Sequence, residues 1–160
     1  MSDVGSRAPD VSVSVVVRRT PADVWDAVAD PRRIASWSPE ASGVSDAEGT
    51  NGPLAVGTTF SGSNKHGIFR WTTRCQVVES TPGEGFAFDV TYLGMSVARW
   101  RYAITAVEGG AEVEEQWWDT RGAPMKALGV VGTGVADRRR HNERTMRATL
   151  DALAADLGEA

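Results

Sequence analysis

One carboxylate stands out in this sequence because it interrupts an apolar alternation. Glu115 falls between Val113 and Trp117, so in an extended strand the three side chains share one face. If that face is buried, desolvation raises the pKa of Glu115. The group would then suit a general acid or base, or a hydrogen-bonding anchor for a ligand. Two ordinary roles stay open, namely an ion pair with Arg138 or Arg139, and exposure where the sheet frays.

Three other polar residues fall on apolar strand faces and enter the candidate site. Asn64 could hydrogen-bond a ligand carbonyl, and it could equally serve the adjoining turn. Tyr102 carries a hydroxyl on a large apolar body and also fits a core position with a satisfied hydroxyl. Thr73 fits an ordinary β-branched strand residue. An apolar pocket with a few convergent polar groups is the usual form of a small-molecule site.

The remaining reactive residues do not form a recognisable catalytic motif. We expect His66 in a hairpin loop and His141 near the start of the last helix. Neither has a second histidine or a carboxylate at metal-ligand spacing, so we predict no metal site and no cofactor. The single cysteine, Cys75, is typical of a small buried hydrophobic residue, and nucleophilic use would need one of the histidines beside it. The glycine-rich run 129–134 matches neither phosphate-loop nor dinucleotide-loop spacing.

Composition and charge limit the classes of protein to which this chain could belong. The chain has 160 residues, of which 41% are hydrophobic and 24% charged, and this predicts one domain with a substantial core. A formal charge of −4 argues against nucleic-acid and anionic-membrane partners, and 138–140 is the only run of basic residues. No apolar run is long enough for a membrane helix, and no charged-then-apolar leader begins the chain. We therefore expect a cytoplasmic protein without stable membrane insertion, whose oligomeric state is open.

A long helix over 135–157 is the element around which the others must be arranged. Its apolar stripe recurs at spacings of 4, 3 and 4 residues through Met146, Leu150, Leu153 and Leu157. Gly158 is a good stop just beyond it. One helical step back from Met146 reaches Asn142, and the next reaches Arg138 or Arg139. The C-terminal half of the stripe therefore predicts core, while the N-terminal half would hold polar groups over the same sheet.

The N-terminal third predicts a strand followed by two short helices. Alternating valines over 11–17 indicate a half-buried strand, after a loose polar tail over 1–10. A cap followed by proline appears twice, at Thr20-Pro21 and at Asp30-Pro31, and each pair predicts a helix start. The second helix carries Trp37.

The middle of the chain predicts an antiparallel meander. Residues 38–57 form a loop with a short edge strand near Val44–Ala47. Alternation then predicts strands with one polar and one apolar face up to residue 117. A glycine-rich connection over 122–134 leads into the last helix. We expect it to form a mobile flap at a cavity mouth, or a short helix, in which the apolar residues are Met125, Leu128, Val130 and Val131.

The order of these elements, strand, two helices, six strands and a long helix, is similar to that of the START-like or SRPBCC superfamily. Within it, the chain resembles the polyketide cyclase/dehydrase and lipid-transport group. The resemblance covers nearly the whole chain. The residues that carry it are Thr20-Pro21-Ala22-Asp23-Val24-Trp25, Asp30-Pro31, Trp37-Ser38-Pro39-Glu40, Gly57-Thr58-Thr59-Phe60, Gly62, Asn64, Trp100-Arg101-Tyr102, Val113, Glu115, Trp117 and the helix Met146–Leu157.

The resemblance implies an α+β helix-grip fold over 11–158, in which a curved antiparallel sheet of six to seven strands wraps around the C-terminal helix. It also implies a cavity for lipids, sterols, polyketides or other apolar molecules, while the fold alone does not choose a function. We expect a carrier or sensor of an apolar ligand. One alternative is a cyclase or dehydratase with Glu115 as acid or base, and another is an interaction module with a filled interior. The expected ligand-binding residues are Trp37, Phe60, Asn64, Trp71, Thr73, Phe88, Trp100, Tyr102, Glu115, Trp117, Arg139, Asn142 and Met146.

Overall fold

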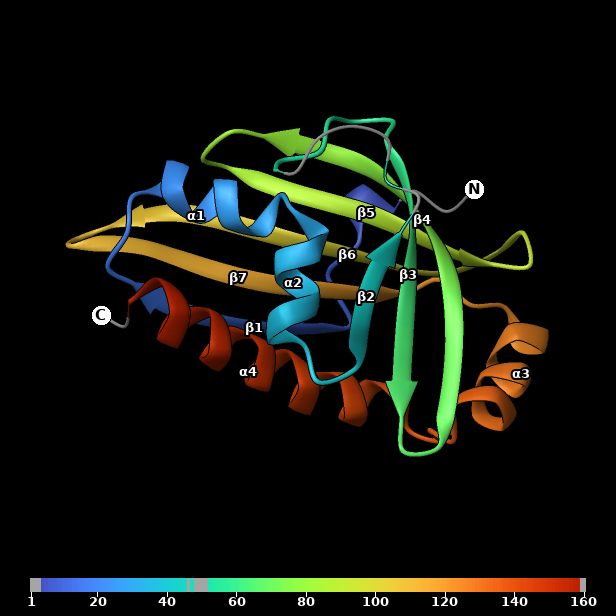
Figure 1. Ribbon diagram of the computed structural model, residues 1–160. Coiled ribbons are helices and arrows are strands. Elements are labelled where there is room, and N and C mark those ends of the chain that lie inside the picture. The colour runs from blue at the N-terminus through green and yellow to red at the C-terminus, as the bar shows by residue number, and fades with distance from the viewer. Residues whose placement is uncertain (1–3, 46, 48–51, 159–160) are drawn as a thin grey trace.

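A single seven-stranded antiparallel sheet forms the body of the protein (Figure 1). The computed structural model describes residues 4–45, 47 and 52–158. The strands lie in the order β1-β7-β6-β5-β4-β3-β2, so all neighbours except β1 and β7 follow each other in the chain. Their bounds are β1 (Val11–Val17), β2 (Ala41–Ser45), β3 (Thr59–His66), β4 (Phe69–Thr81), β5 (Gly85–Tyr92), β6 (Met95–Val107) and β7 (Gly110–Asp119).

The two short helices begin where the sequence predicts them. In α1 (Pro21–Val28), Thr20 is the N-cap and its hydroxyl accepts a hydrogen bond from the Asp23 amide at 3.2 Å. In α2 (Pro31–Trp37), the Asp30 carboxylate accepts one from the Arg32 amide at 3.0 Å. Proline at the first helical position has no amide hydrogen to leave unpaired, and its fixed φ suits the helix.

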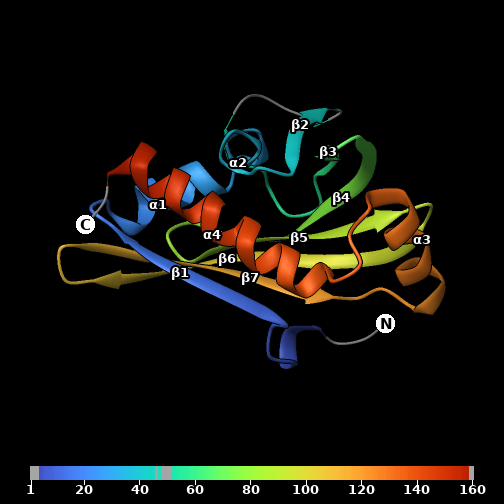
Figure 2. The ribbon, with the colours of Figure 1, turned by 90° about the horizontal axis from the view of Figure 1, so that it is seen from below.

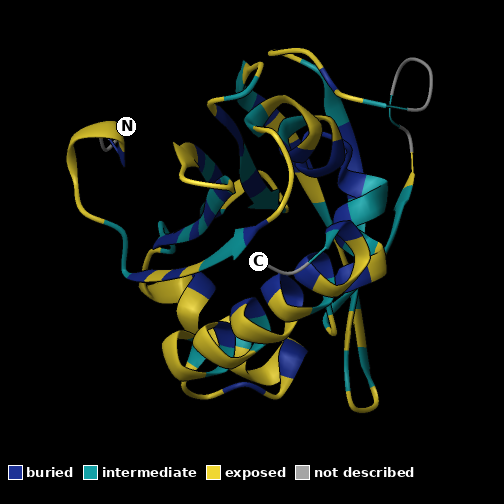
Figure 3. Ribbon diagram, turned by 90° about the vertical axis from the view of Figure 1, so that its left-hand side faces the viewer, coloured by how far each residue is buried: buried dark blue, intermediate teal, exposed yellow. Residues whose placement is uncertain are grey.

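The last helix, α4 (Arg138–Leu157), lies across one face of the curled sheet (Figure 2). Its contacts with the sheet are mainly with β1, and it also packs against α2. Buried and exposed residues alternate along it, as expected for an amphipathic helix (Figure 3). The predicted stripe of Met146, Leu150, Leu153 and Leu157 is buried in the core, so the helix-grip fold is confirmed.

Three local predictions agree with the structure only in part. The edge strand expected near Val44–Ala47 is β2, which runs from Ala41 to Ser45; Asp46 lies outside the described residues. Residues 4–10 are not loose, because Val4 is buried in a short 3-10 helix (Val4–Ser6) and the Arg7 carbonyl accepts a hydrogen bond from the Trp118 indole at 2.8 Å. Residues 1–3 of the expected tail lie outside the described residues.

The third concerns the glycine-rich connection, which was expected to form either a mobile flap or a short helix. The connection is a helix, α3 (Ala123–Thr133), with Pro124 in its first turn. This is the second of the two conformations expected for it. Gly134 ends the helix in the left-handed conformation at φ 71°, which glycine adopts without strain. None of the described helices combines the length and apolar character needed to cross a membrane.

Candidate ligand-binding cavity

A cavity of about 350 Å³ lies between the sheet and α4. This volume falls within the range of small-molecule pockets. The sheet contributes seven aromatic side chains to its lining, and α2, α3 and α4 complete its wall. Eleven of the residues expected in the site line it: Phe60, Asn64, Trp71, Thr73, Phe88, Trp100, Tyr102, Glu115, Trp117, Asn142 and Met146.

Two expected site residues lie outside this lining. The indole nitrogen of Trp37 donates to the Asp156 carboxylate on α4 at 3.0 Å, so this tryptophan packs α2 against α4. Arg139 is exposed, and Arg138 lines the cavity in its place. A spacing of 3.6 residues per turn permits either arginine after Asn142, and the sequence therefore did not separate them.

The apolar residues of α3 divide between the cavity and the surface. Met125 and Leu128 line the cavity, as expected for residues at its entrance. Val130 and Val131 do not line it, and Val131 is 76% exposed. These four positions were expected to act together, and the helical conformation of α3 explains why they do not: successive residues point in different directions.

Glu115 and Tyr102 form the buried polar pair of the cavity. They face each other across the β6–β7 ladder, and the Tyr102 hydroxyl donates a hydrogen bond of 2.9 Å to Oε1 of Glu115. Glu115 is 3% exposed, and its other oxygen, Oε2, has no hydrogen-bond partner. Burial raises the pKa of Glu115 to about 8, although the bond from Tyr102 opposes the rise. Burial also raises the pKa of Tyr102, so its hydroxyl stays protonated.

The ordinary roles considered for Glu115 are both wrong. It is not exposed at a frayed edge, because β7 pairs with β1 on one side and β6 on the other. It does not pair with Arg138, whose guanidinium is 2.7 Å from the Glu40 carboxylate. A buried carboxyl group without a cationic partner is held as the neutral acid at neutral pH.

Two further polar residues meet on β3 and β4. The side-chain amide of Asn64 donates to the Thr73 hydroxyl at 3.4 Å and to the Gly62 carbonyl at 3.2 Å. Asn64 therefore stabilises the pairing of β3 with β4 and does not serve the adjoining turn. Cys75 lies below them, and burial raises the pKa of its thiol to about 12, so a thiolate nucleophile is not available there.

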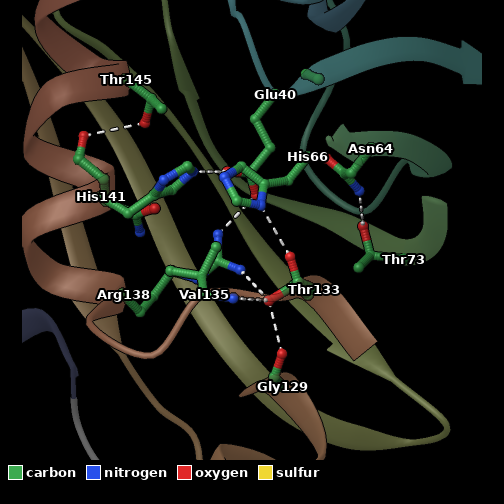
Figure 4. Close-up of polar contacts among 12 residues, drawn as sticks. Glu40, Asn64, His66, Thr73, Gly129, Thr133, Val135, Arg138, His141 and Thr145 are labelled. Carbon is green, nitrogen blue, oxygen red and sulfur yellow. Dashed lines mark hydrogen bonds and ion pairs between the residues drawn. The ribbon is translucent and has the colours of Figure 1, made fainter. Parts of the chain in front are cut away.

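A polar cluster that the sequence analysis did not anticipate lies beside the cavity (Figure 4). Its centre is Glu40, whose two carboxylate oxygens contact Arg138 at 2.7 Å and His141 at 2.5 Å. Burial disfavours the charge on Glu40, but the bonds from His141 and Arg138 outweigh burial and lower its pKa. The ring of His66 packs edge-on against that of His141 and contacts the Thr133 carbonyl at 3.0 Å. We call these five residues the Glu40 cluster.

The Glu40 cluster joins four segments that lie far apart in the sequence. Glu40 precedes β2, His66 ends β3, Thr133 ends α3, and the remaining two residues begin α4. No spacing rule relates these positions, so sequence patterns could not reveal the cluster. Within residues 4–45, 47 and 52–158, no group of three or more histidine, cysteine or acidic residues has an arrangement that could hold a metal ion.

A curled antiparallel sheet that grips a C-terminal helix around an aromatic-lined cavity defines a helix-grip protein of the START-like superfamily. The polyketide cyclase/dehydrase and lipid transport family matches residues 8–158, and the chain belongs to that family. No curated protein matches the chain.

Several solved structures share this fold. The di-domain ARO/CYC StfQ from the steffimycin biosynthetic pathway is 14% identical, with a TM-score of 0.68; the match covers 92% of this chain and 49% of StfQ. Protein CV1439 from Chromobacterium violaceum is 15% identical over 94% of this chain and 97% of its own, with a TM-score of 0.66. Cgl2372 from Corynebacterium glutamicum, a Polyketide_cyc-like protein, is 22% identical over 92% and 93%, with a TM-score of 0.57. At these identities the similarity establishes the fold alone.

Proposed function

We propose that this protein binds an apolar small molecule in the cavity between the sheet and α4, as a carrier or sensor. The ligand class is a lipid, a polyketide-like compound or an aromatic compound. The observation that carries the proposal is the cavity itself, with a volume of about 350 Å³ and walls that include Trp71, Trp100 and Trp117. Burial of apolar ligand surface there contributes roughly 25 cal/mol per Å². The few polar groups in the wall would set the orientation of the ligand.

The same observation counts against the alternative of an interaction module. A filled interior would leave no space larger than a water molecule, which occupies about 30 Å³ in the liquid. The cavity is roughly ten times larger. An open cavity of this size leaves apolar side chains in contact with water, and ligand binding would remove that apolar surface from water.

Native mass spectrometry of the freshly purified protein tests the proposal. We expect a mass adduct that survives gentle ionisation and leaves under denaturing conditions, and its mass would give the ligand class. A protein that stayed at its apo mass after incubation with lipid extract and with aromatic ketones would contradict the proposal. The same spectra recorded on an unrelated protein of similar size control for detergent-like adducts.

A second candidate function is catalysis of cyclisation or dehydration on a polyketide-like substrate. The free Oε2 of Glu115 in the cavity wall favours it, because a neutral carboxylic acid can protonate a leaving hydroxyl and its conjugate base can remove a proton next to a carbonyl. The hydroxyl hydrogen of Tyr102 is already donated to Glu115. The amide hydrogens of Asn64 are also donated, to Gly62 and Thr73, so either group would have to give up a present hydrogen bond to hold a developing enolate oxygen.

The variant Glu115→Gln separates the two functions. A catalytic Glu115 predicts that a linear poly-β-ketoacyl thioester is still bound by the variant but no longer converted to a cyclic product. Equal losses of binding and turnover would remove the catalytic function and leave the carrier. Product formation can be followed by the ultraviolet absorbance of the aromatic ring that forms.

A further inference from the structure

One oxygen atom in the cavity wall is without a partner. Of the buried side-chain nitrogen and oxygen atoms in the described part of the chain, Oε2 of Glu115 is the one that makes no hydrogen bond. Buried polar atoms in folded proteins nearly always have a partner, so an orphan of this kind needs an explanation. Glu115 lines the cavity, so a ligand bound there is the candidate partner for this oxygen.

The neighbouring hydrogen bond decides which oxygen carries the proton. The Tyr102 hydroxyl donates to Oε1, so Oε1 acts as the acceptor and the proton of the neutral acid belongs on Oε2. Within the described residues, Glu115 is the hydrogen-bond partner of the Tyr102 hydroxyl, so a reversed bond would leave the Tyr102 hydrogen without an acceptor. Oε2 is therefore a hydrogen-bond donor without an acceptor.

The surroundings of Glu115 keep it neutral. Its neighbour on β1 is Val13, and of the residues that α4 contributes to the cavity lining, only Arg138 is charged; the others are Asn142, Thr145, Met146 and Thr149. Among the titratable groups of the lining, Tyr102 and Cys75 have raised pKa values and are neutral too. The charged groups of the lining are engaged elsewhere: Glu40 with Arg138 at 2.7 Å, Arg121 with Asp119 at 2.8 Å, and Arg70 with the Gly67 carbonyl at 2.8 Å.

We propose that Oε2 of Glu115 donates a hydrogen bond to the carbonyl oxygen of a neutral ligand, and that the cavity therefore selects aromatic or aliphatic ketones and esters over hydrocarbons and amines of the same shape. This inference rests on the proposed function and narrows its ligand class. A carbonyl oxygen accepts without bringing a hydrogen of its own, which matches a buried donor. A cationic amine would instead need the carboxylate and would carry its charge into an apolar cavity.

Three naphthalenes of nearly equal shape test the selection: 2-acetylnaphthalene, 2-isopropylnaphthalene and 1-(2-naphthyl)ethylamine. Their dissociation constants would be measured by titration calorimetry at pH 6 and pH 9.5, for the wild type, Glu115→Gln and Glu115→Leu. For each protein, the preference for ketone is the dissociation constant of the hydrocarbon divided by that of the ketone. This ratio is then compared with the same ratio in Glu115→Leu. This comparison cancels the different hydration of the two compounds.

In the wild type at pH 6, we expect the preference to exceed that of Glu115→Leu by about tenfold. At pH 9.5 it should disappear, because the ionised carboxylate has no proton to donate. Glu115→Gln should keep the preference at both pH values, since its amide N–H replaces the O–H and does not titrate. The carbonyl stretch of bound 2-acetylnaphthalene should lie at lower frequency in the wild type than in Glu115→Leu.

The outcomes separate this inference from the function on which it rests. Binding of the hydrocarbon with an unchanged ketone preference in Glu115→Leu would overturn the inference and leave the proposed function intact. A preference that grew at pH 9.5, or tightest binding of the amine, would show an ionised Glu115 and would also overturn it. Absence of binding by all three compounds would overturn the proposed function, and the inference with it. Retained hydrocarbon affinity shows that each variant is folded.

Discussion

Oε2 of Glu40 lies 2.5 Å from Nε2 of His141, although 101 residues separate them in the chain. Arg138 contacts the other oxygen of the same carboxylate, so one side chain holds the first turn of α4 to the segment before β2. Both partners of Glu40 are mostly buried, with side-chain exposures of 12% and 13%. Ion pairs of this kind are sensitive to loss of one member, because the remaining charge stays buried.

Replacing Glu40 by glutamine should destabilise the protein at pH 7 by about 2 kcal/mol, because Arg138 loses its counter-charge. The pKa of Glu40 is lowered in the folded state, so its contribution is fully present above the unfolded value of 4.5 and is lost as pH falls through the lower folded pKa. Urea denaturation at pH 7 and at pH 3 should therefore show a smaller difference between wild type and variant at pH 3.

Glu143→Gln is the matched control for this prediction. Glu143 also lies on α4, and its pair with Arg147 spans 3.8 Å between side chains that are 53% and 63% exposed. Its loss should change stability by less than about 0.5 kcal/mol. Equal effects of the two substitutions would contradict the structural role given to Glu40.

Glu115 should affect the pH dependence of stability with the opposite sign. Its folded pKa of about 8 lies above the unfolded value of 4.5, so the folded state holds the proton more tightly. Wild-type stability should therefore fall as pH rises between these values. Glu115→Gln removes this dependence, and relative to wild type it should gain on the order of 3 kcal/mol between pH 5 and pH 8. Chemical denaturation at both pH values measures the gain, and a constant difference would contradict it.

Gly110 is required by close packing at the end of the β6–β7 hairpin. A Cβ atom on it would overlap the carbonyl oxygen of Val17, which belongs to the backbone and cannot move aside. Gly110→Ala should therefore destabilise the protein by about 3 kcal/mol. Gly132→Ala is the control, since a Cβ there meets nothing within 4 Å in α3 and alanine favours the helix by about 0.5 kcal/mol. Opposite shifts of the melting temperature are expected, and two similar shifts would contradict this.

Filling the cavity should remove binding without removing the fold. Thr73 lines the cavity, while its neighbour Thr72 is exposed on the other face of β4. Thr73→Trp should weaken binding of 2-isopropylnaphthalene by more than about tenfold, since the indole takes up ligand space. Thr72→Trp adds the same side chain outside and should leave affinity within about twofold. Equal affinities in the two variants would place the ligand elsewhere.

Strand alternation predicted the inner face of the sheet well. Glu115, Tyr102 and Trp117 all point where a period of two residues places them, because a half-buried sheet leaves each side chain only two directions. The starts of the two short helices could also be predicted, because Thr20 and Asp30 accept hydrogen bonds from amides only two or three residues further along the chain. Both features depend on residues that are close together in the sequence, so the sequence alone is enough to predict them.

Contacts between distant segments account for what the sequence did not show. Trp37 was expected at the cavity, but its indole meets Asp156, which is 119 residues away. Helical periodicity did not distinguish Arg138 from Arg139, and the choice follows from the position of Glu40. The conformation of α3 was undecided, although Met125 and Leu128 at a spacing of three residues, after Pro124, signal a helix.

The helix α4 forms one wall of the cavity, and different contacts hold its two ends. At its C-terminal end, two backbone carbonyls accept hydrogen bonds: that of Gly158 from the Arg18 amide at 3.0 Å, and that of Leu157 from the Arg19 guanidinium at 2.5 Å. Its first turn is tied by the side chain of Glu40. The buried stripe of α4 and the contacts of Asp156 with α2 hold the helix between these two ends. Separating the first turn of α4 from Glu40 would break one ion pair and one hydrogen bond, and no backbone hydrogen bond between strands.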